Sequence, residues 1–183
     1  PGTRAYTNDP ESLRLKKADS HNTITVDNAD HARLWGYFRW AFLPDDPSYT
    51  ATCCCHGFSL AAQYTGFKHI GGITHRRVFC LKPDELLIED RVTYSGVRDI
   101  SINFILHPLI QVARTDNTSL ILSAGKHRWL LQSAATVQPA ISVAPIKVYM
   151  EYALPTASHK ITLLSRHCDA RFESRVVLRN LPD

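Results

Sequence analysis

The sequence lacks the features that would place it in a membrane. It has no run of about 18 consecutive apolar residues and no apolar leader with a positively charged start. It begins at Pro1 rather than at a methionine, so we expect a fragment of a longer protein. Its 183 residues suffice for one domain, which would bury roughly 70% of the surface of the unfolded chain and needs no disulfide or metal to fold.

The chain also lacks a spaced cysteine framework. Its five cysteines include no CxxC pair, and Cys53, Cys54 and Cys55 are consecutive. This pattern argues against a disulfide-stapled module and against a zinc ribbon. Successive strand residues point to opposite faces, so these cysteines and His56 cannot converge on one ion. We interpret the triplet as buried small apolar residues.

The excess of positive charge is small. The 21 basic and 17 acidic residues give a formal net charge of +4. This balance favours anionic partners modestly, but the chain has none of the dense lysine and arginine stripes typical of nucleic-acid binders. An acidic carbohydrate therefore fits this charge balance better than a nucleic acid does.

No segment keeps a helical period of 3.6 residues, and the apolar pattern is typical of short strands separated by turns. The sequence predicts an all-β, two-sheet antiparallel β-sandwich that forms a single domain over residues 1–183. Turns are expected at 94–96, 116–118 and 124–125, and a loop over the sheet face at 56–72 with a helical turn at 60–63. The expected strands are 13–16, 23–27, 34–43, 50–55, 78–81, 86–88, 100–106, 109–113, 120–123, 127–132, 147–152, 161–165 and 172–178.

One hairpin can be predicted with its register. Pro83 suits the second position of a type I turn, and pairing Lys82 with Glu85 would place Arg77 opposite Asp90. We expect a surface ion pair there, worth ~0.2 to 1 kcal/mol. His75 would share the face of Arg77, so these side chains could instead point into an anion-binding cleft.

His21 lies in a polar loop that leads into the expected strand 23–27. On its own, such a histidine is usually a solvated or hydrogen-bonded residue. Its context, however, resembles the C-terminal β domain of heparinase II/III-like proteins over nearly the whole chain, by motif to about residue 110 and by strand pattern beyond it. The matching segments are Pro1 to Tyr6, Ser20-His21-Asn22-Thr23, Val26-Asp27, Leu34 to Arg39, Tyr64 to Lys68, Thr74 to Val78, Glu89-Asp90-Arg91 and His107-Pro108.

The resemblance implies a lyase that cleaves a glycosidic bond beside a uronic acid by β-elimination. That reaction needs neutralisation of the carboxylate, a base for the C5 proton and an acid for the leaving oxygen. In the family, a preceding α/α-toroid domain supplies a tyrosine and further groups, while the β domain supplies the histidine that matches His21. We therefore expect His21 to be catalytic, and Asn22, His75 and Arg77 to bind substrate, in a chain that lacks the toroid and is inactive alone. The resemblance also suggests a periplasmic or secreted protein.

Some family members bind a structural metal through a histidine two places after the catalytic one. Here that position is Thr23, and Tyr64 stands where another ligand is expected. A hydroxyl and a phenol are poor replacements in a zinc site, so we expect no metal and no cofactor. Possible substitute ligands are Asp27, His31, His56 and His69.

Two other functions remain open. A non-catalytic carbohydrate-binding domain could use Trp35, Tyr37 and Trp40 as an aromatic platform, with Trp35 and Tyr37 on one face of a strand. Aromatic side chains more often fill the core, and we favour that interpretation. The domain could also be a scaffold in a protein for surface-polysaccharide assembly, because fold resemblance alone does not fix function.

Overall fold

The computed structural model describes residues 2–54 and 57–182. Within these ranges almost all regular structure is β-strand, and every pairing is antiparallel, which confirms the predicted all-β fold. The elements in chain order are α1 (Pro10–Arg14), η1 (Ala18–Ser20), β1 (Ile24–Val26), β2 (Arg33–Gly36), β3 (Arg39–Ala41), β4 (Ser48–Cys54), β5 (Gly57–Gly66), η2 (Lys68–Ile70), β6 (Ile73–Lys82), β7 (Glu85–Ile105), β8 (Gln111–Arg114), β9 (Ser119–Ala124), β10 (His127–Ala135), β11 (Ala140–Glu151) and β12 (Leu154–Leu181).

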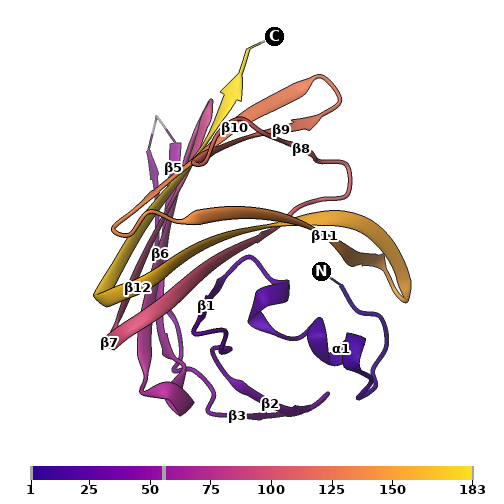
Figure 1. Cartoon of the computed structure of the whole chain (residues 1–183), viewed down its shortest axis with the longest axis vertical. Helices are drawn as coiled ribbons and strands as arrows, with labels where there is room; N and C mark the ends of the chain where they lie inside the picture. Colours follow the sequence, from indigo (N-terminus) through magenta and orange to yellow (C-terminus); the bar gives the residue numbers. More distant parts are fainter. Residues whose placement is uncertain (1, 55–56, 183) are drawn as a thin grey trace.

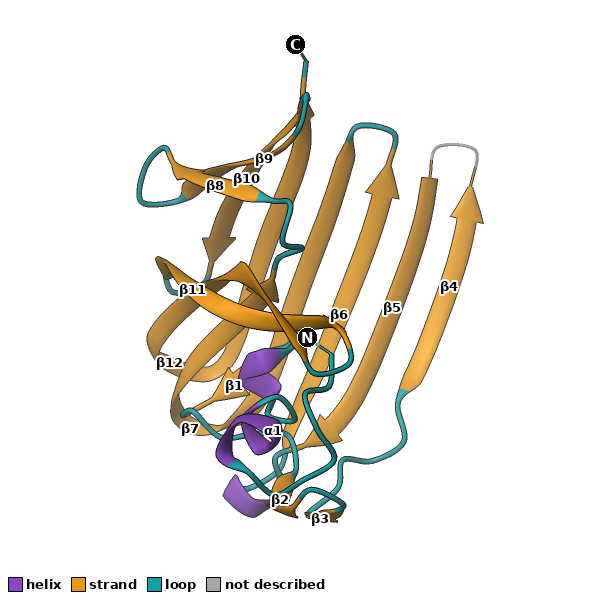
Figure 2. Cartoon of the chain, turned by 90° about the vertical axis from the view of Figure 1, so that its right-hand side faces the viewer, coloured by secondary structure: helices purple, strands orange, loops and turns teal. Residues whose placement is uncertain are grey.

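Ten of the strands form one large sheet, and β2 and β3 form a small separate one. The large sheet runs β4-β5-β6-β7-β12-β10-β9-β8, with β1 added beside β7 and β11 beside β12. Figure 2 shows β4, β5, β6 and β7 side by side. The N-terminal segment, which carries α1 and the β2–β3 hairpin, lies beneath β11 in Figure 1.

The two longest strands, β7 and β12, extend through both halves of this sheet. In one half, residues 85–93 of β7 pair with residues 171–179 of β12, and in the other half residues 100–105 of β7 pair with residues 160–165 of β12. The register shifts between these stretches, and Gly96 has a φ of 77° there. Bulges bend strands and increase their twist, so the sheet turns here and β11 diverges from β10 (Figure 1).

Apolar side chains from both halves form one core. The even positions of the predicted strand 100–106 point into it, with Ile100 and Ile102 fully buried, as the alternation predicted. The most buried part of this core also contains Phe67, Phe172 and Leu163. Because Ser101 and Asn103 are also buried, both faces of β7 are covered where it carries β1.

Two local predictions in the first 72 residues were wrong. Residues 13–16 belong to a helical turn instead of a strand, because the Asp9 side chain accepts hydrogen bonds from the amides of Glu11 and Ser12 and Pro10 begins the helix. Residues 57–66 form β5 between β4 and β6, where a loop with a helical turn was expected. The ladder hydrogen bonds to both neighbours outweigh the weak strand propensity of its alanines.

Other predictions were only partly right. The turn signal at 94–96 marks the bulge within β7, and the predicted strands 161–165 and 172–178 are parts of β12. Cys53 is exposed, contrary to the expected burial of the triplet, while Cys55 and His56 lie outside the described residues. Trp35 is 70% exposed although Tyr37 is only 6% exposed, because Tyr37 lies in the turn after β2 and does not share a strand face with Trp35.

Candidate functional site

The loop that carries His21 is held between the helical N-terminal segment and the second half of β7. The His21 amide donates to the Ala18 carbonyl at 3.0 Å, and the Thr23 amide donates to the His21 carbonyl at 2.9 Å. The Lys160 ammonium of β12 donates to the Asp19 carbonyl at 3.2 Å. The loop is therefore held by its own backbone hydrogen bonds and by the Lys160 side chain.

The His21 imidazole is exposed but has a defined orientation. Its Nε2 lies 2.9 Å from the Leu15 carbonyl oxygen. A carbonyl can only accept, so Nε2 carries the hydrogen in this contact, and the neutral ring keeps Nδ1 as its proton-accepting nitrogen. Partial burial lowers the pKa of His21 below 6.5, although the Leu15 carbonyl acts in the opposite direction. The geometry thus favours a neutral imidazole that can accept a proton near neutral pH.

His21 lies between two surface depressions. The first, of about 300 Å³, is also lined by Asn22 and His107. The second, of about 260 Å³, is also lined by Lys16, Tyr37 and other residues of the N-terminal segment. Among the described residues, His21 is the only one that lines both depressions.

Asn22 joins this loop to the sheet. Its side-chain Oδ1 accepts a hydrogen bond from the Ile105 amide at 2.6 Å, at the end of β7. Its main-chain carbonyl accepts one from Nη1 of Arg77 at 2.6 Å. Because both oxygens are engaged, the Nδ2 amide is the part of the Asn22 side chain with a hydrogen-bonding function to spare.

Arg77, His75 and Asp90 form a buried cluster below the loop. The Nε and Nη2 atoms of Arg77 donate to the two carboxylate oxygens of Asp90 at 2.7 and 3.0 Å. Nε2 of His75 lies 2.6 Å from Oδ1 of the same carboxylate. Burial by itself raises the pKa of Asp90, but the hydrogen bond from His75 and the charge of Arg77 outweigh it, so the pKa is lowered and Asp90 stays ionised.

This cluster confirms the predicted register, in which Lys82 pairs with Glu85 and Arg77 lies opposite Asp90. The expected surface position was wrong, because Arg77 is 8% exposed and Asp90 is 2% exposed. Strand alternation correctly placed His75 and Arg77 on one face of β6. It could not show that the loop before β1, which carries His21 and Asn22, covers that face. The guanidinium therefore supports the Asn22 carbonyl from below instead of standing at the surface.

The comparisons with known proteins identify the family and the fold of this chain. The family model described as "Heparinase II/III-like, C-terminal" matches residues 1–177. This chain belongs to the heparinase II/III-like family. Among solved structures, a heparan sulfate lyase HepC mutant from Pedobacter heparinus has a TM-score of 0.74 at 14% identity, and the match covers 100% of this chain and 28% of that one.

Two further structures have the same fold as this heparinase II/III-like chain. A heparinase III with methylated lysines matches with a TM-score of 0.73 at 13% identity, over 100% of this chain and 27% of its own. Another heparinase III matches with a TM-score of 0.69 at 11% identity, over 94% of this chain and 26% of its own. This chain thus spans just over a quarter of the length of those proteins. No curated protein matches its sequence significantly.

A metal does not fit the residues of this heparinase II/III-like chain at the position where some relatives have ligands. Tyr64 lies beside Thr23 and packs edge-on against the His75 ring at a centroid distance of 5.5 Å, and burial raises its phenol pKa. Both oxygens of Asp90 are occupied by Arg77 and His75. In the part of the chain that is described, no three His, Cys, Asp or Glu side chains gather as a metal site, although His56 falls outside it.

The sequence named His21, Asn22, His75 and Arg77 as candidates but did not point to two groups beside them. The Leu15 carbonyl that orients His21 belongs to a segment that was expected to be a strand. Lys16, which lines the second depression, gave no motif signal beyond the basic pair Lys16-Lys17 shortly before the histidine.

None of the described helices is long and apolar enough to span a bilayer.

Proposed function

We propose that this domain forms one wall of the active site of a lyase that cleaves an acidic polysaccharide by β-elimination, with His21 as a proton-transfer residue. The observation that carries the proposal is the place of His21, which is exposed between two depressions and keeps Nδ1 available. A polymer that crosses the site would put one sugar unit in each depression and the bond between them beside the imidazole.

The chemistry assigns each group a definite task. A base removes the proton from C5 beside the uronic carboxylate, the C4–O4 bond breaks, and an acid protonates the departing oxygen, which leaves a C4–C5 double bond. His21, neutral because desolvation lowers its pKa, can accept such a proton. The remaining acid and the carboxylate neutraliser would come from a toroid domain, as the family resemblance implies.

Asn22, His75 and Arg77 have different parts in this proposal. Asn22 is exposed and can offer its Nδ2 amide to a sugar hydroxyl or carboxylate. His75 and Arg77 are buried and hydrogen-bonded to Asp90, so we propose that they bind substrate only indirectly, by holding the loop through the Asn22 carbonyl. They are positioning residues in the sense that they act through another residue.

A non-catalytic carbohydrate-binding domain is the second candidate. It is favoured by the exposed aromatic side chains around the β2–β3 hairpin, of which Trp35 is 70% and Phe38 is 75% exposed. Aromatic faces of this kind can stack on sugar rings without any proton transfer. Under this alternative, His21 would be dispensable for whatever activity the complete protein has.

Replacement of His21 separates the two candidates. In the protein encoded by the complete gene, His21→Ala should lower turnover at least ~100-fold, the usual size of a general acid or base contribution. Its melting temperature should change little, since the exposed ring contributes one hydrogen bond, worth about 1 kcal/mol. His127→Ala, at an exposed histidine outside both depressions, is the matched control. A His21→Ala protein that is fully active per folded molecule would remove His21 from the reaction.

A further inference from the structure

Lys16 is a half-buried cation beside His21 that has no carboxylate partner among the described residues. Its ammonium lies 3.9 Å from the centre of the Tyr37 ring and about 6 Å from those of Phe38 and Trp40. Aromatic faces attract a cation through their quadrupole, but they do not neutralise its charge. The ammonium therefore keeps hydrogen-bond donors that the rings leave unused.

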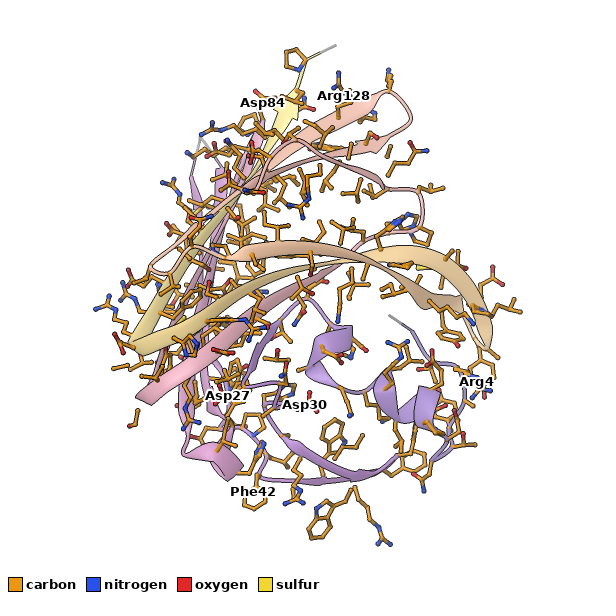
Figure 3. The ribbon with its side chains drawn as sticks, viewed as in Figure 1. Arg4, Asp27, Asp30, Phe42, Asp84 and Arg128 are labelled. Carbon is orange, nitrogen blue, oxygen red and sulfur yellow. The ribbon has the colours of Figure 1, made fainter. Side chains whose placement is uncertain are left out.

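Three other cations nearby are paired with carboxylates, whereas the adjacent Lys17 is exposed and lies outside the second depression. Arg4, which lies beside α1 in Figure 3, forms an ion pair with Asp9, and Arg14 forms one with Glu11. Asp19 in the His21 loop lies 3.7 Å from Lys160. Of the two described cations that line the second depression, Arg4 is paired with Asp9 and Lys16 is not, so the charge of Lys16 remains available to a ligand.

Lys16, Tyr37 and Trp40 share the second depression with His21. Its volume of about 260 Å³ lies below the usual range of drug-sized ligand pockets, roughly 300 to 1,000 Å³, and suits a single sugar ring. The lining combines an uncompensated positive charge with aromatic surface, and the two together recognise a sugar ring that bears a negative group. The first depression has no lysine or arginine in its lining.

We propose that Lys16 binds the negative group, carboxylate or sulfate, of the sugar unit that occupies the depression formed with Tyr37 and Trp40. This inference rests on the proposed function, because it assigns the charged unit to one of the two sides of His21. The two sides then differ in specificity: the Lys16 side requires an acidic sugar, and the side lined by Asn22 and His107 does not.

A purely structural role for Lys16 predicts something different. The ammonium would then only hold the β2–β3 turn through Tyr37, and its loss would lower stability without changing the preference between charged and neutral ligands. The discrimination between ligands is thus the readout that a structural role does not move. Lys17 supplies a matched control, since it is adjacent, exposed and outside both depressions.

The test measures dissociation constants in the protein encoded by the complete gene, with His21→Ala present so that the probes are not cleaved. The probes are a heparan sulfate tetrasaccharide, its desulfated form, and the same desulfated form with its carboxyl groups reduced to alcohols. Lys16→Met should weaken binding of a charged probe about tenfold, which corresponds to about 1.4 kcal/mol, and leave the neutral probe unchanged. Lys16→Arg and Lys17→Met should bind as the parent does.

The probes also identify the group that Lys16 contacts. Weakened binding of both charged probes assigns a carboxylate, and weakened binding of the sulfated probe alone assigns a sulfate. Equal effects on charged and neutral probes, or no effect on any, overturn the inference. Full turnover by the His21→Ala protein would overturn the proposed function instead, and this outcome is read independently of the binding constants.

Discussion

Arg77 lies directly opposite Asp90 across the β6–β7 ladder, and both side chains are buried. Two nitrogens of the guanidinium donate hydrogen bonds to the carboxylate of Asp90. The third donates to the main-chain carbonyl of Asn22, in the loop that carries His21. A buried charge pair of this kind is expensive to break, because either partner alone would remain as an uncompensated charge. The geometry of the candidate site therefore depends on a buried ion pair.

We expect Asp90→Asn to destabilise the domain by about 3 to 5 kcal/mol, the range for breaking a buried pair by removing one partner. The variant leaves Arg77 charged and without its carboxylate. Urea denaturation followed by circular dichroism measures the difference. Glu89→Gln, at the neighbouring exposed position with only a 4.0 Å contact to Arg175, should stay within ~1 kcal/mol of the parent. Similar stabilities for the two variants would contradict the buried-pair account.

The buried cluster of His75, Arg77 and Asp90 also predicts how the stability of the domain changes as the pH falls. The pKa of Asp90 is lower in the folded protein than the ordinary value of 3.8. Its contribution to stability is therefore complete above that value and is lost as the pH falls through the folded pKa. The denaturation midpoint of the parent protein should fall as the pH is lowered from 6 to 2. The share of this fall that is due to protonation of Asp90 should be absent from Asp90→Asn.

The pKa of His21 predicts the acidic limb of the rate profile. Because desolvation lowers this pKa below 6.5, the imidazole stays neutral and able to accept a proton at a lower pH than a solvated histidine. The acidic inflection of kcat/KM should therefore lie below pH 6.5 in the protein encoded by the complete gene. An acidic inflection above pH 6.5 would show that another group controls this limb.

We also expect the purified chain to carry no stoichiometric zinc. Thr23 and Tyr64 occupy the positions where the family resemblance implies ligands, and Asp90 has both oxygens engaged. Elemental analysis after purification without a chelator or a metal-affinity tag is sufficient. One equivalent of zinc per chain would show that other side chains assemble a site.

Local sequence rules predicted the parts of this fold that depend on local chemistry. The β6–β7 hairpin and its register followed from Pro83 at the turn and from the flanking apolar residues. The long strands were harder to predict, because the turn signal around Gly96 marks a bulge that continues β7. The capped helix at Pro10 was not predicted, because the alternation of residues 13–16 is typical of a strand.

In the candidate site, too, local sequence patterns indicated some features, while contacts between distant segments determine the others. The motif located His21, and strand alternation placed His75 and Arg77 together, as the shared bonds to Asp90 confirm. Their burial was not predictable, because it results from the β1 loop packing over a face of β6 that lies far away in sequence. Neither was the environment of Lys16, which is made by Tyr37 in the turn of a separate small sheet.

The pairing of β1 with β7 also determines when the site can form. Ile24 pairs with Ile102, and the bond from Arg77 to Asn22 joins residues that are 55 positions apart. Contacts between such distant residues cost loop-closure entropy and slow folding. His21 precedes β6 and β7 in sequence, and we expect its loop to reach its final position once these two strands have paired.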